Sequence, residues 1–225
     1  MVKINKLEAD LDFLAAIHKI NPTLLDGMAL PSYFHKNPLV RWITTKRMKK
    51  ALELVEIGTG TRLLDYGCGS GILFLQLPKN LGEYIGVELI LWPAEMVLKH
   101  HNRNDIQLIE VGNWKDSVSD KSLDYIIATE VLEHVEDVAS TISDLEGKLK
   151  SGGKLIISLP TENFFYQLGR KIAGFSGDYH KYEKVKLHNL IINQTFVFER
   201  RVAIPFICPF CLYEFFLFTK RNNIE

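Results

Sequence analysis

Short apolar runs alternate with segments of helical periodicity through the middle of the chain. The apolar runs cover residues 61–65, 84–88, 106–111, 123–129 and 154–159. Segments with helix-like spacing of apolar residues lie between them, at 71–78, 92–101 and 137–149. This alternation indicates β-α-β units, which build a parallel sheet covered by helices on both faces.

The alternation breaks down toward the C-terminus. After helical segments near 163–173 and 182–192, two β-type runs at 194–202 and 212–219 follow each other directly. Strands joined without a crossover helix pair antiparallel. We therefore predict an α/β fold with a seven-stranded, mostly parallel sheet, an antiparallel last strand and helices on both faces.

The residues before the first strand are predicted to be helical. Residues 7–20 place their apolar side chains on one stripe and are followed by a loop up to residue 36. A stronger helix is predicted to start at Pro38, with Asn37 as its cap, and to end at Gly58. We expect residues 1–58 to form a helical cap that is one compact unit with the domain over residues 59–225.

Four basic residues on the second predicted helix allow two interpretations. We interpret them as a solvated flank, and contact with an anionic ligand or a membrane is the alternative. These residues are Lys46, Arg47, Lys49 and Lys50.

Composition excludes several classes of protein. Of the 225 residues 47% are hydrophobic, and 27 basic side chains balance 27 acidic ones. The hydrophobic fraction excludes a disordered chain. The zero net charge excludes a protein-wide basic field, so no nucleic-acid partner is expected. No uncharged apolar run reaches the roughly 18 residues of a membrane span, and acidic residues interrupt the N-terminal stretch that a signal peptide needs apolar.

The cysteine content indicates the cellular compartment. Cys68, Cys208 and Cys211 are too few for a disulfide framework, so we predict a cytoplasmic location. Cys68 is expected to be a small buried residue. The spacing of Cys208 and Cys211 is that of thiol-redox motifs, but the pair lies between two late strands and no second pair exists for zinc. No metal site is therefore predicted.

A glycine-rich loop directly after the first predicted strand is the main candidate for chemistry. It reads Asp65-Tyr66-Gly67-Cys68-Gly69-Ser70-Gly71, and its glycines allow a tight turn and a close approach to a ligand. A following helix would offer free N–H groups to an anion. The next strand ends at Glu88, where a carboxylate can accept both hydroxyls of a ribose. A dinucleotide fingerprint would need glycine at position 72, which is Ile72.

With these motifs the sequence resembles the class I S-adenosylmethionine-dependent methyltransferases over roughly residues 38–220. Their first motif is acid-x-Gly-x-Gly-x-Gly, which Asp65 and the three glycines match. Residues 123–135 and 149–160 are similar to the fourth and fifth strand regions of the small-molecule branch, which includes the ubiquinone-biosynthesis O-methyltransferases. The resemblance implies a Rossmann-like fold, with S-adenosylmethionine as the cofactor.

The resemblance also assigns cofactor contacts to positions of this chain. Asp65 and the glycines would hold the methionine end, and Glu88 the ribose. Leu89 would lie against the adenine, and Asn113, followed by Trp114, stands where many relatives have an aspartate that binds the adenine amino group. Thr129 and Glu130 would lie beside the sulfonium. The cofactor-binding residues predicted are therefore Asp65, Gly67, Gly69, Gly71, Glu88, Leu89, Asn113, Trp114, Thr129 and Glu130.

The predicted function is methyl transfer from S-adenosylmethionine to a small-molecule or lipid-like acceptor. An oxygen acceptor would need a proton removed, for which His134, His180 and Glu130 are the candidate bases. A carbon or amine acceptor can accept the methyl group without a base that removes a proton. The alternatives are a non-catalytic cofactor-binding module of the same fold and a nicotinamide oxidoreductase, which Ile72 disfavours.

Residues 24–36 and 160–192 are predicted to form a mobile cover over the acceptor site, and ordinary helix packing is the alternative. Their aromatic side chains are Tyr33, Phe34, Phe164, Phe165, Tyr166 and Tyr179. Residues 164–175 mix aromatic side chains with two cations, which is typical of an interfacial helix. With the apolar runs 203–207 and 215–218, this composition predicts an apolar acceptor and a peripheral membrane contact. Burial of these runs in the sheet or in a dimer contact is the alternative, and the oligomeric state is left open.

Overall fold

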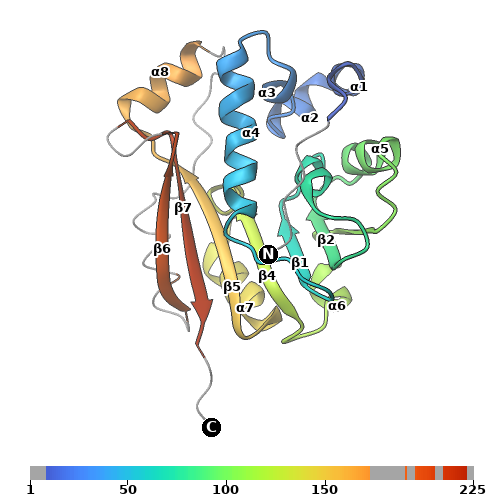
Figure 1. The fold of residues 1–225 in the computed structure, drawn as a ribbon, viewed down its shortest axis with the longest axis vertical. Coiled ribbons are helices and arrows are strands. Elements are labelled where there is room, and N and C mark those ends of the chain that lie inside the picture. The colour runs from blue at the N-terminus through green and yellow to red at the C-terminus, as the bar shows by residue number, and fades with distance from the viewer. Residues whose placement is uncertain (1–8, 173–190, 192–195, 206–209, 222–225) are drawn as a thin grey trace.

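A computed structural model of the chain describes residues 9–172, 191, 196–205 and 210–221. Seven strands form one sheet in the order β3-β2-β1-β4-β5-β7-β6 (Figure 1). The strands are β1 (Arg62–Tyr66), β2 (Glu83–Glu88), β3 (Ile106–Glu110), β4 (Leu123–Thr129), β5 (Leu149–Pro160), β6 (Phe196–Ile204) and β7 (Tyr213–Lys220). The first five strands are parallel, and β7 pairs antiparallel with both β5 and β6. The predicted α/β sheet with its antiparallel last strand is confirmed.

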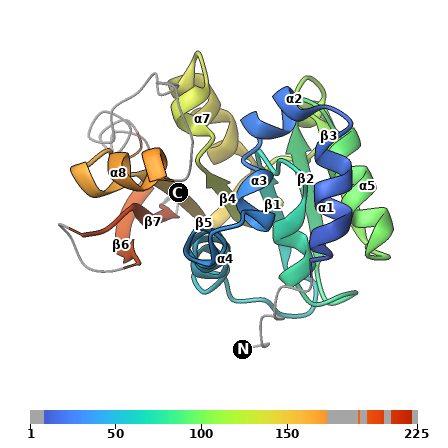
Figure 2. The ribbon, with the colours of Figure 1, turned by 90° about the horizontal axis from the view of Figure 1, so that it is seen from above.

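Alternate residues of each strand point to opposite faces, so the sheet has two hydrophobic cores. Leu63 of β1 belongs to the core under α1, α2, α4 and α5. Its neighbour Leu64 belongs to the core under α6 and α7 on the opposite face. Figure 2 shows α4 and α7 on opposite sides of the sheet. The helices named are α1 (Leu11–His18), α2 (Pro22–Gly27), α4 (Pro38–Leu52), α5 (Trp92–His100), α6 (Trp114–Ser117) and α7 (Val138–Lys148).

The N-terminal helices differ from the prediction in two places. The loop expected before residue 36 contains two short helices, α2 and α3 (Pro31–Phe34), each with a proline in its first turn. Helix α4 starts at Pro38 with the Asn37 side chain as its cap, as predicted, but ends at Leu52 rather than Gly58. The next apolar side chains are those of Leu54, Val55 and Ile57, and all three are buried. The chain leaves the helix at Leu52 because a single helical face could not bury all of them.

The segment after the glycine loop is also different. Where the sequence predicted a crossover helix over 71–78, the chain forms a 3-10 helix, η1 (Ile72–Gln76). Leu77 is extended with ψ 143°, since it precedes Pro78 and a proline disfavours helical geometry in the residue before it. The expected α-helix N-terminus is therefore absent at this point of the described chain.

The C-terminal apolar runs are placed differently from one another. Phe215, Phe216, Leu217 and Phe218 are buried, because β7 lies inside the sheet between β5 and β6. The expectation that residues 215–218 expose apolar surface is wrong. Helix α8 (Phe164–Ile172), in contrast, exposes Phe164, Phe165 and Leu168. Most of the predicted helix 182–192 lies outside the described residues, and so does Tyr179 of the predicted cover.

Within the described residues, no helix has both the length and the apolar character that crossing a membrane requires. Cys68 is buried with a free thiol, as predicted. Cys211 is buried as well, and Cys208 lies outside the described part of the chain.

Candidate functional site

The glycine loop leaves β1 at the carboxyl edge of the sheet. The N–H groups of Gly67 and Cys68 both donate to Val87 O, at 2.8 and 3.1 Å, which ties the loop to β2. Gly67, Gly69 and Gly71 have φ angles of 77°, 54° and 71°, a region that favours glycine. A Cβ on Gly67 would collide with Val131 at 2.5 Å, whereas a Cβ on Gly69 would meet nothing within 4 Å. The loop is therefore packed at Gly67 and open at Gly69.

Glu88 closes the loop from the end of β2. One carboxylate oxygen accepts the N–H of Gly69 at 2.8 Å, and the other accepts the N–H of Leu89 at 2.7 Å. Each carboxylate oxygen carries two lone pairs, so both can accept a further hydrogen bond. The sequence placed Glu88 beside the glycine loop, and the structure shows the direct bond that joins them.

Asp65 lies beneath the loop with only 3% of its surface exposed. Its Oδ1 is buried and has no hydrogen-bond partner among the described residues. Burial, together with the nearby Glu88 carboxylate, raises the pKa of Asp65 to about 7. An unpartnered buried oxygen is unfavourable, which marks this position as one that a ligand donor would satisfy.

The three residues expected at the adenine occupy different environments. Leu89 is 72% exposed, directly after the Glu88 carboxylate. Asn113 is exposed at the start of α6. Trp114 is 1% exposed and packs edge-to-face on Tyr66, with ring centroids 5.5 Å apart, in the core beneath α6. Leu89 and Asn113 are thus available to a ligand at the surface, and the described surroundings of Trp114 are those of a core residue.

Thr129 and Glu130 end β4 and start the next loop at the same edge. Glu130 has a φ of 54°, and its N–H donates to Ser158 O at 3.1 Å. Its side chain accepts a hydrogen bond from Ser158 Oγ at 3.3 Å and forms an ion pair with the Arg47 guanidinium. The carboxylate is thereby fixed between α4, β4 and β5.

Arg47 is a functional candidate that the sequence interpretation grouped with three other basic residues as a solvated flank, with contact to an anionic ligand as the alternative. It is not on a solvated flank: its side chain is 14% exposed, and its guanidinium carbon lies 5.1 Å from the centre of the Tyr213 ring. Burial opposes the charge, but Glu130 and the tyrosines Tyr213 and Tyr33 outweigh it, so the pKa of Arg47 is raised. Its spacing from Thr44 and Ala51 matches the apolar stripe of the helix, which is the signal that could have placed it inward.

Two tyrosines from different elements lie close to the Arg47 guanidinium. Tyr33 of α3 donates its hydroxyl to Met48 Sδ at 2.8 Å, and burial raises its pKa. Tyr213 of β7 has a pKa raised to about 12 by burial and by Glu130. Its ring packs edge-to-face on Tyr166 of α8, with centroids 5.6 Å apart. Tyr33 and Tyr166, two of the predicted cover residues, therefore border this part of the site.

The two histidines among the candidate bases lie in different parts of the chain. His134 is exposed in the short 3-10 helix η2 (Leu132–His134), and His180 lies outside the described residues. The buried polar residue of η2 is Glu133, which is 2% exposed and has no hydrogen-bond partner for either carboxylate oxygen among the described residues. Burial, followed by the Glu130 carboxylate, raises the pKa of Glu133 to about 8. A three-residue turn is too short to show a periodic pattern, so the burial of Glu133 rather than His134 could not be predicted from the sequence.

A glycine loop, an acid at the end of the second strand and a seven-stranded sheet with an antiparallel last strand together define a Rossmann-like α/β protein with a ligand site at the carboxyl edge. The chain belongs to the family of methyltransferase domains, whose pattern matches residues 39–191. The resemblance inferred from the sequence is thereby confirmed.

Relatives with assigned names share part of the chain. The ubiquinone biosynthesis O-methyltransferase of Rhodopseudomonas palustris (strain BisA53) is 23% identical over 170 residues, which cover 73% of this chain and 62% of that protein. The aligned region therefore spans less than two thirds of the length of this relative.

Solved structures show the same fold at low identity. The magnesium protoporphyrin IX methyltransferase of Synechocystis PCC 6803, with bound SAH, superposes with a TM-score of 0.62 at 16% identity, over 92% of this chain and 99% of that one. The [4+2]-cyclase SpnF superposes with a TM-score of 0.66 at 13% identity, over 98% and 99%. Because a protein named for a different reaction shares the fold, the reaction has to be argued from the site.

Proposed function

We propose that this chain binds S-adenosylmethionine at the glycine loop and transfers its methyl group to a small-molecule acceptor. The observation that carries the proposal is the polar arrangement around the open Gly69: the unpartnered Oδ1 of Asp65 on one side and the Glu88 carboxylate on the other. This order of loop and acid in a member of the methyltransferase family supports S-adenosylmethionine over a nicotinamide dinucleotide.

The residues fit the chemistry of this cofactor. Its methionine end carries an ammonium group, which would donate a hydrogen bond to the unpartnered Asp65 oxygen. It also carries a carboxylate, for which the Arg47 guanidinium at the same edge of the sheet is a candidate partner. Its ribose hydroxyls would donate to the free lone pairs of Glu88. Leu89 and Asn113 are exposed where the adenine would follow the ribose.

When bound, the cofactor supplies an electrophilic methyl group on a sulfonium. The chain would contribute alignment, because holding the acceptor atom in line with the methyl accounts for most of the acceleration in such a displacement. Thr129 and Glu130 at the end of β4 border this position. Glu130, held by Arg47 and Ser158, offers a carboxylate oxygen that can accept a hydrogen bond from an acceptor hydroxyl. His134 and His180 stay candidates for proton removal from an oxygen acceptor.

The acceptor is proposed to be apolar and to reach the site from a membrane surface. Helix α8 exposes Phe164 and Phe165, and Phe165 packs on the exposed Phe210 with ring centroids 4.9 Å apart. The next residue after Arg170 on this helix is an exposed lysine, Lys171. Adjacent aromatic and cationic side chains on one helix are suited to an anionic interface.

Flotation with anionic vesicles at low salt tests the membrane part of the proposal. Phe165→Ser is expected to reduce the bound fraction. Phe198→Ser changes an equally exposed aromatic ring at the end of β6 away from α8, and it is expected to leave the bound fraction unchanged. A wild-type protein that stays unbound at low salt would show that the acceptor does not arrive in this way.

The enzymatic part is tested in two steps. A thermal-shift series with S-adenosylhomocysteine (SAH), NAD and no ligand should show stabilisation by SAH alone. Incubation with labelled S-adenosylmethionine and a cell extract should then transfer label to an extractable product. Stabilisation by NAD would favour an oxidoreductase, and SAH binding without label transfer would favour a non-catalytic module. The cytoplasmic location predicted from the sequence is tested by cell fractionation.

A further inference from the structure

The glycine loop continues directly into η1, an element that is weak on its own. Five-residue 3-10 helices have poor hydrogen-bond geometry and leave their last carbonyl groups without partners in the helix. At the two ends of η1, Phe74 N donates to Gly71 O at 3.1 Å and Leu77 N donates to Phe74 O at 3.2 Å. The geometry of the loop at Gly71 therefore depends on what holds the far end of η1.

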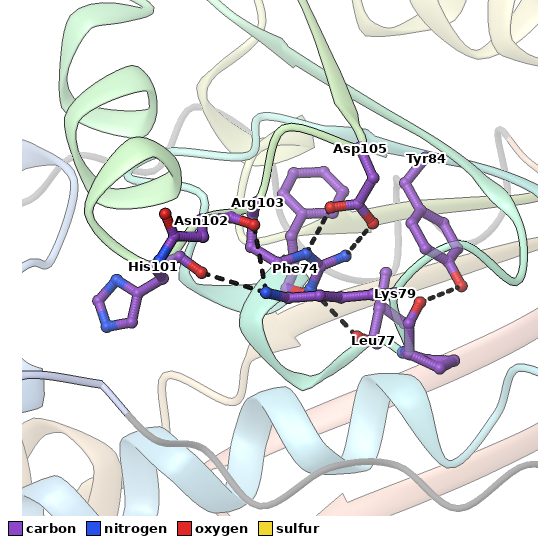
Figure 3. A network of polar contacts seen from close by, with 9 residues as sticks. Phe74, Leu77, Lys79, Tyr84, His101, Asn102, Arg103 and Asp105 are labelled. Carbon is purple, nitrogen blue, oxygen red and sulfur yellow. Dashed lines mark hydrogen bonds and ion pairs between the residues drawn. The ribbon is translucent and has the colours of Figure 1, made fainter.

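Arg103 supplies that support from the turn after α5. Its guanidinium donates to the carbonyl oxygens of Phe74 and Leu77, the latter at 3.1 Å, and is itself only 3% exposed. Asp105 holds the opposite edge of the guanidinium through two bonds of 2.8 Å (Figure 3). A bidentate carboxylate fixes the plane of an arginine, so the two N–H groups of Nη1 point at the end of η1.

The same turn is held in the opposite direction by Lys79. This lysine follows η1 and donates to the carbonyl oxygens of Asn102 and His101, at 3.2 and 3.5 Å, which lie at the C-terminal end of α5. Each element is thus capped by a residue that follows the other, and Figure 3 shows both sets of contacts side by side. We call Lys79, Arg103 and Asp105 the reciprocal cap.

The two elements joined by the reciprocal cap carry the two halves of the proposed cofactor site. The glycine loop leads into η1, and Glu88 with Leu89 leads into α5. Near the loop the elements also touch, because a Cβ on Gly71 would lie 3.3 Å from the Cβ of Ala94 in α5. A shift of η1 against α5 would therefore move Gly69 away from Glu88, to which its N–H is bonded at 2.8 Å.

We propose that Arg103 is a positioning residue for cofactor binding, which holds the glycine loop in register with Glu88 through η1. The proposal rests on the cofactor site argued above. It concerns a residue that contacts no part of that site directly and lies beyond the far end of η1.

The test compares Arg103→Met with a matched control on the opposite face of the sheet. Lys148 of α7 is a buried cation that likewise donates to a carbonyl and an aspartate, Lys115 O at 2.5 Å and Asp120 at 2.7 Å. Lys148→Met should therefore lower the melting temperature in the same way without touching η1. SAH affinity is measured by calorimetry well below the melting temperature of each variant, and amide exchange is followed along the chain.

Arg103→Met is expected to weaken SAH binding by about tenfold and to accelerate exchange at the amides of Phe74 and Leu77, while β4 and β5 exchange as in the wild type. Lys148→Met is expected to bind SAH within about twofold of the wild type. Arg103→Lys, which keeps a donor for the carbonyls but loses the bidentate pair, should bind with intermediate affinity and decides the matter if Arg103→Met does not fold.

Wild-type affinity in a folded Arg103 variant would overturn the proposal, as would equal losses of affinity in the Arg103 and Lys148 variants, which would point to global stability. Failure of the wild type itself to bind SAH would instead contradict the proposed cofactor site. The two outcomes are therefore distinguishable.

Discussion

Replacing Asp65 by asparagine should stabilise the ligand-free protein and weaken cofactor binding at the same time. Asp65 is buried, and its pKa is raised from 3.8 to about 7, so the folded state holds this proton more tightly than the unfolded state does. The stability that this proton provides is complete below pH 3.8 and is lost as the pH rises to 7. Above that pH the ionised group costs the folded state about 4 kcal/mol, an upper estimate at 1.36 kcal/mol per pKa unit.

The substitution removes that cost because an amide does not ionise. An asparagine NH2 group without a partner costs about 1–2 kcal/mol in return. Asp65→Asn should therefore raise the free energy of unfolding by about 2–3 kcal/mol at pH 8 and lower it by about 1 kcal/mol at pH 4, where little ionisation cost is left to remove. SAH affinity should fall by at least about tenfold, since the ammonium group loses its charged partner.

Urea unfolding at the two pH values, with calorimetry of SAH, measures both effects. Asp116→Asn on the exposed surface of α6 is the matched control, and it should change neither quantity. A destabilised Asp65→Asn protein at pH 8 would refute the assignment of Asp65 as a buried, unpartnered carboxyl. Unchanged SAH affinity would refute its role toward the methionine end.

Three further outcomes are expected from the same site. The SAH affinity of the wild type should fall about tenfold between pH 8 and pH 6, because Asp65 must lose its proton to pair with the ligand ammonium; a flat calorimetric profile would contradict this. Glu133→Gln should raise the free energy of unfolding at pH 8 by about 2–4 kcal/mol and have little effect at pH 4, since the pKa of Glu133 is raised from 4.5 to about 8; equal effects at both pH values in urea unfolding would argue against a buried neutral acid. Arg47→Met should cost about 2–4 kcal/mol of stability and at least tenfold in SAH affinity because it leaves the half-buried Glu130 without its ion pair, whereas Lys46→Met, whose ammonium lies over the exposed Trp42, should change neither.

The sheet could be predicted from the sequence because each strand is set by a strong local pattern. Residues 123–129 and 106–111, for example, were expected as strands and form β4 and β3. The glycine loop was found for the same reason, since its residues are consecutive. Features that depend on a few neighbouring residues are the ones that a single sequence reveals.

The differences arise where tertiary contacts decide the local structure. Helix α3 has only four residues, and helices of that length are not stable on their own. The apolar side chains of Leu54, Val55 and Ile57 were expected to continue the helix, yet they follow the end of α4 and are buried in the core. Such departures from local preference require the packing that only the folded chain supplies.

The site was predicted in part for a related reason. Asp65, Glu88 and Glu130 follow strands, so the parallel sheet itself brings them to one edge. Arg47 comes from a distant helix and reaches this edge through the packing of α4, and its basic neighbours on the helix concealed it. Glu133 and His134 are adjacent in sequence, and only the turn of η2 determines which of them is buried.

The most direct test of the proposed cofactor site compares two glycine substitutions by calorimetry with SAH. Gly69 and Gly60 have φ angles of 54° and 76°, and a Cβ on either would meet nothing within 4 Å in the ligand-free protein. Alanine at either position should therefore cost roughly 1 kcal/mol of backbone strain. Only Gly69 faces the proposed cofactor. We expect Gly60→Ala to bind SAH as the wild type does and Gly69→Ala to lose detectable binding. A folded Gly69→Ala protein with wild-type SAH affinity would contradict the proposed cofactor site.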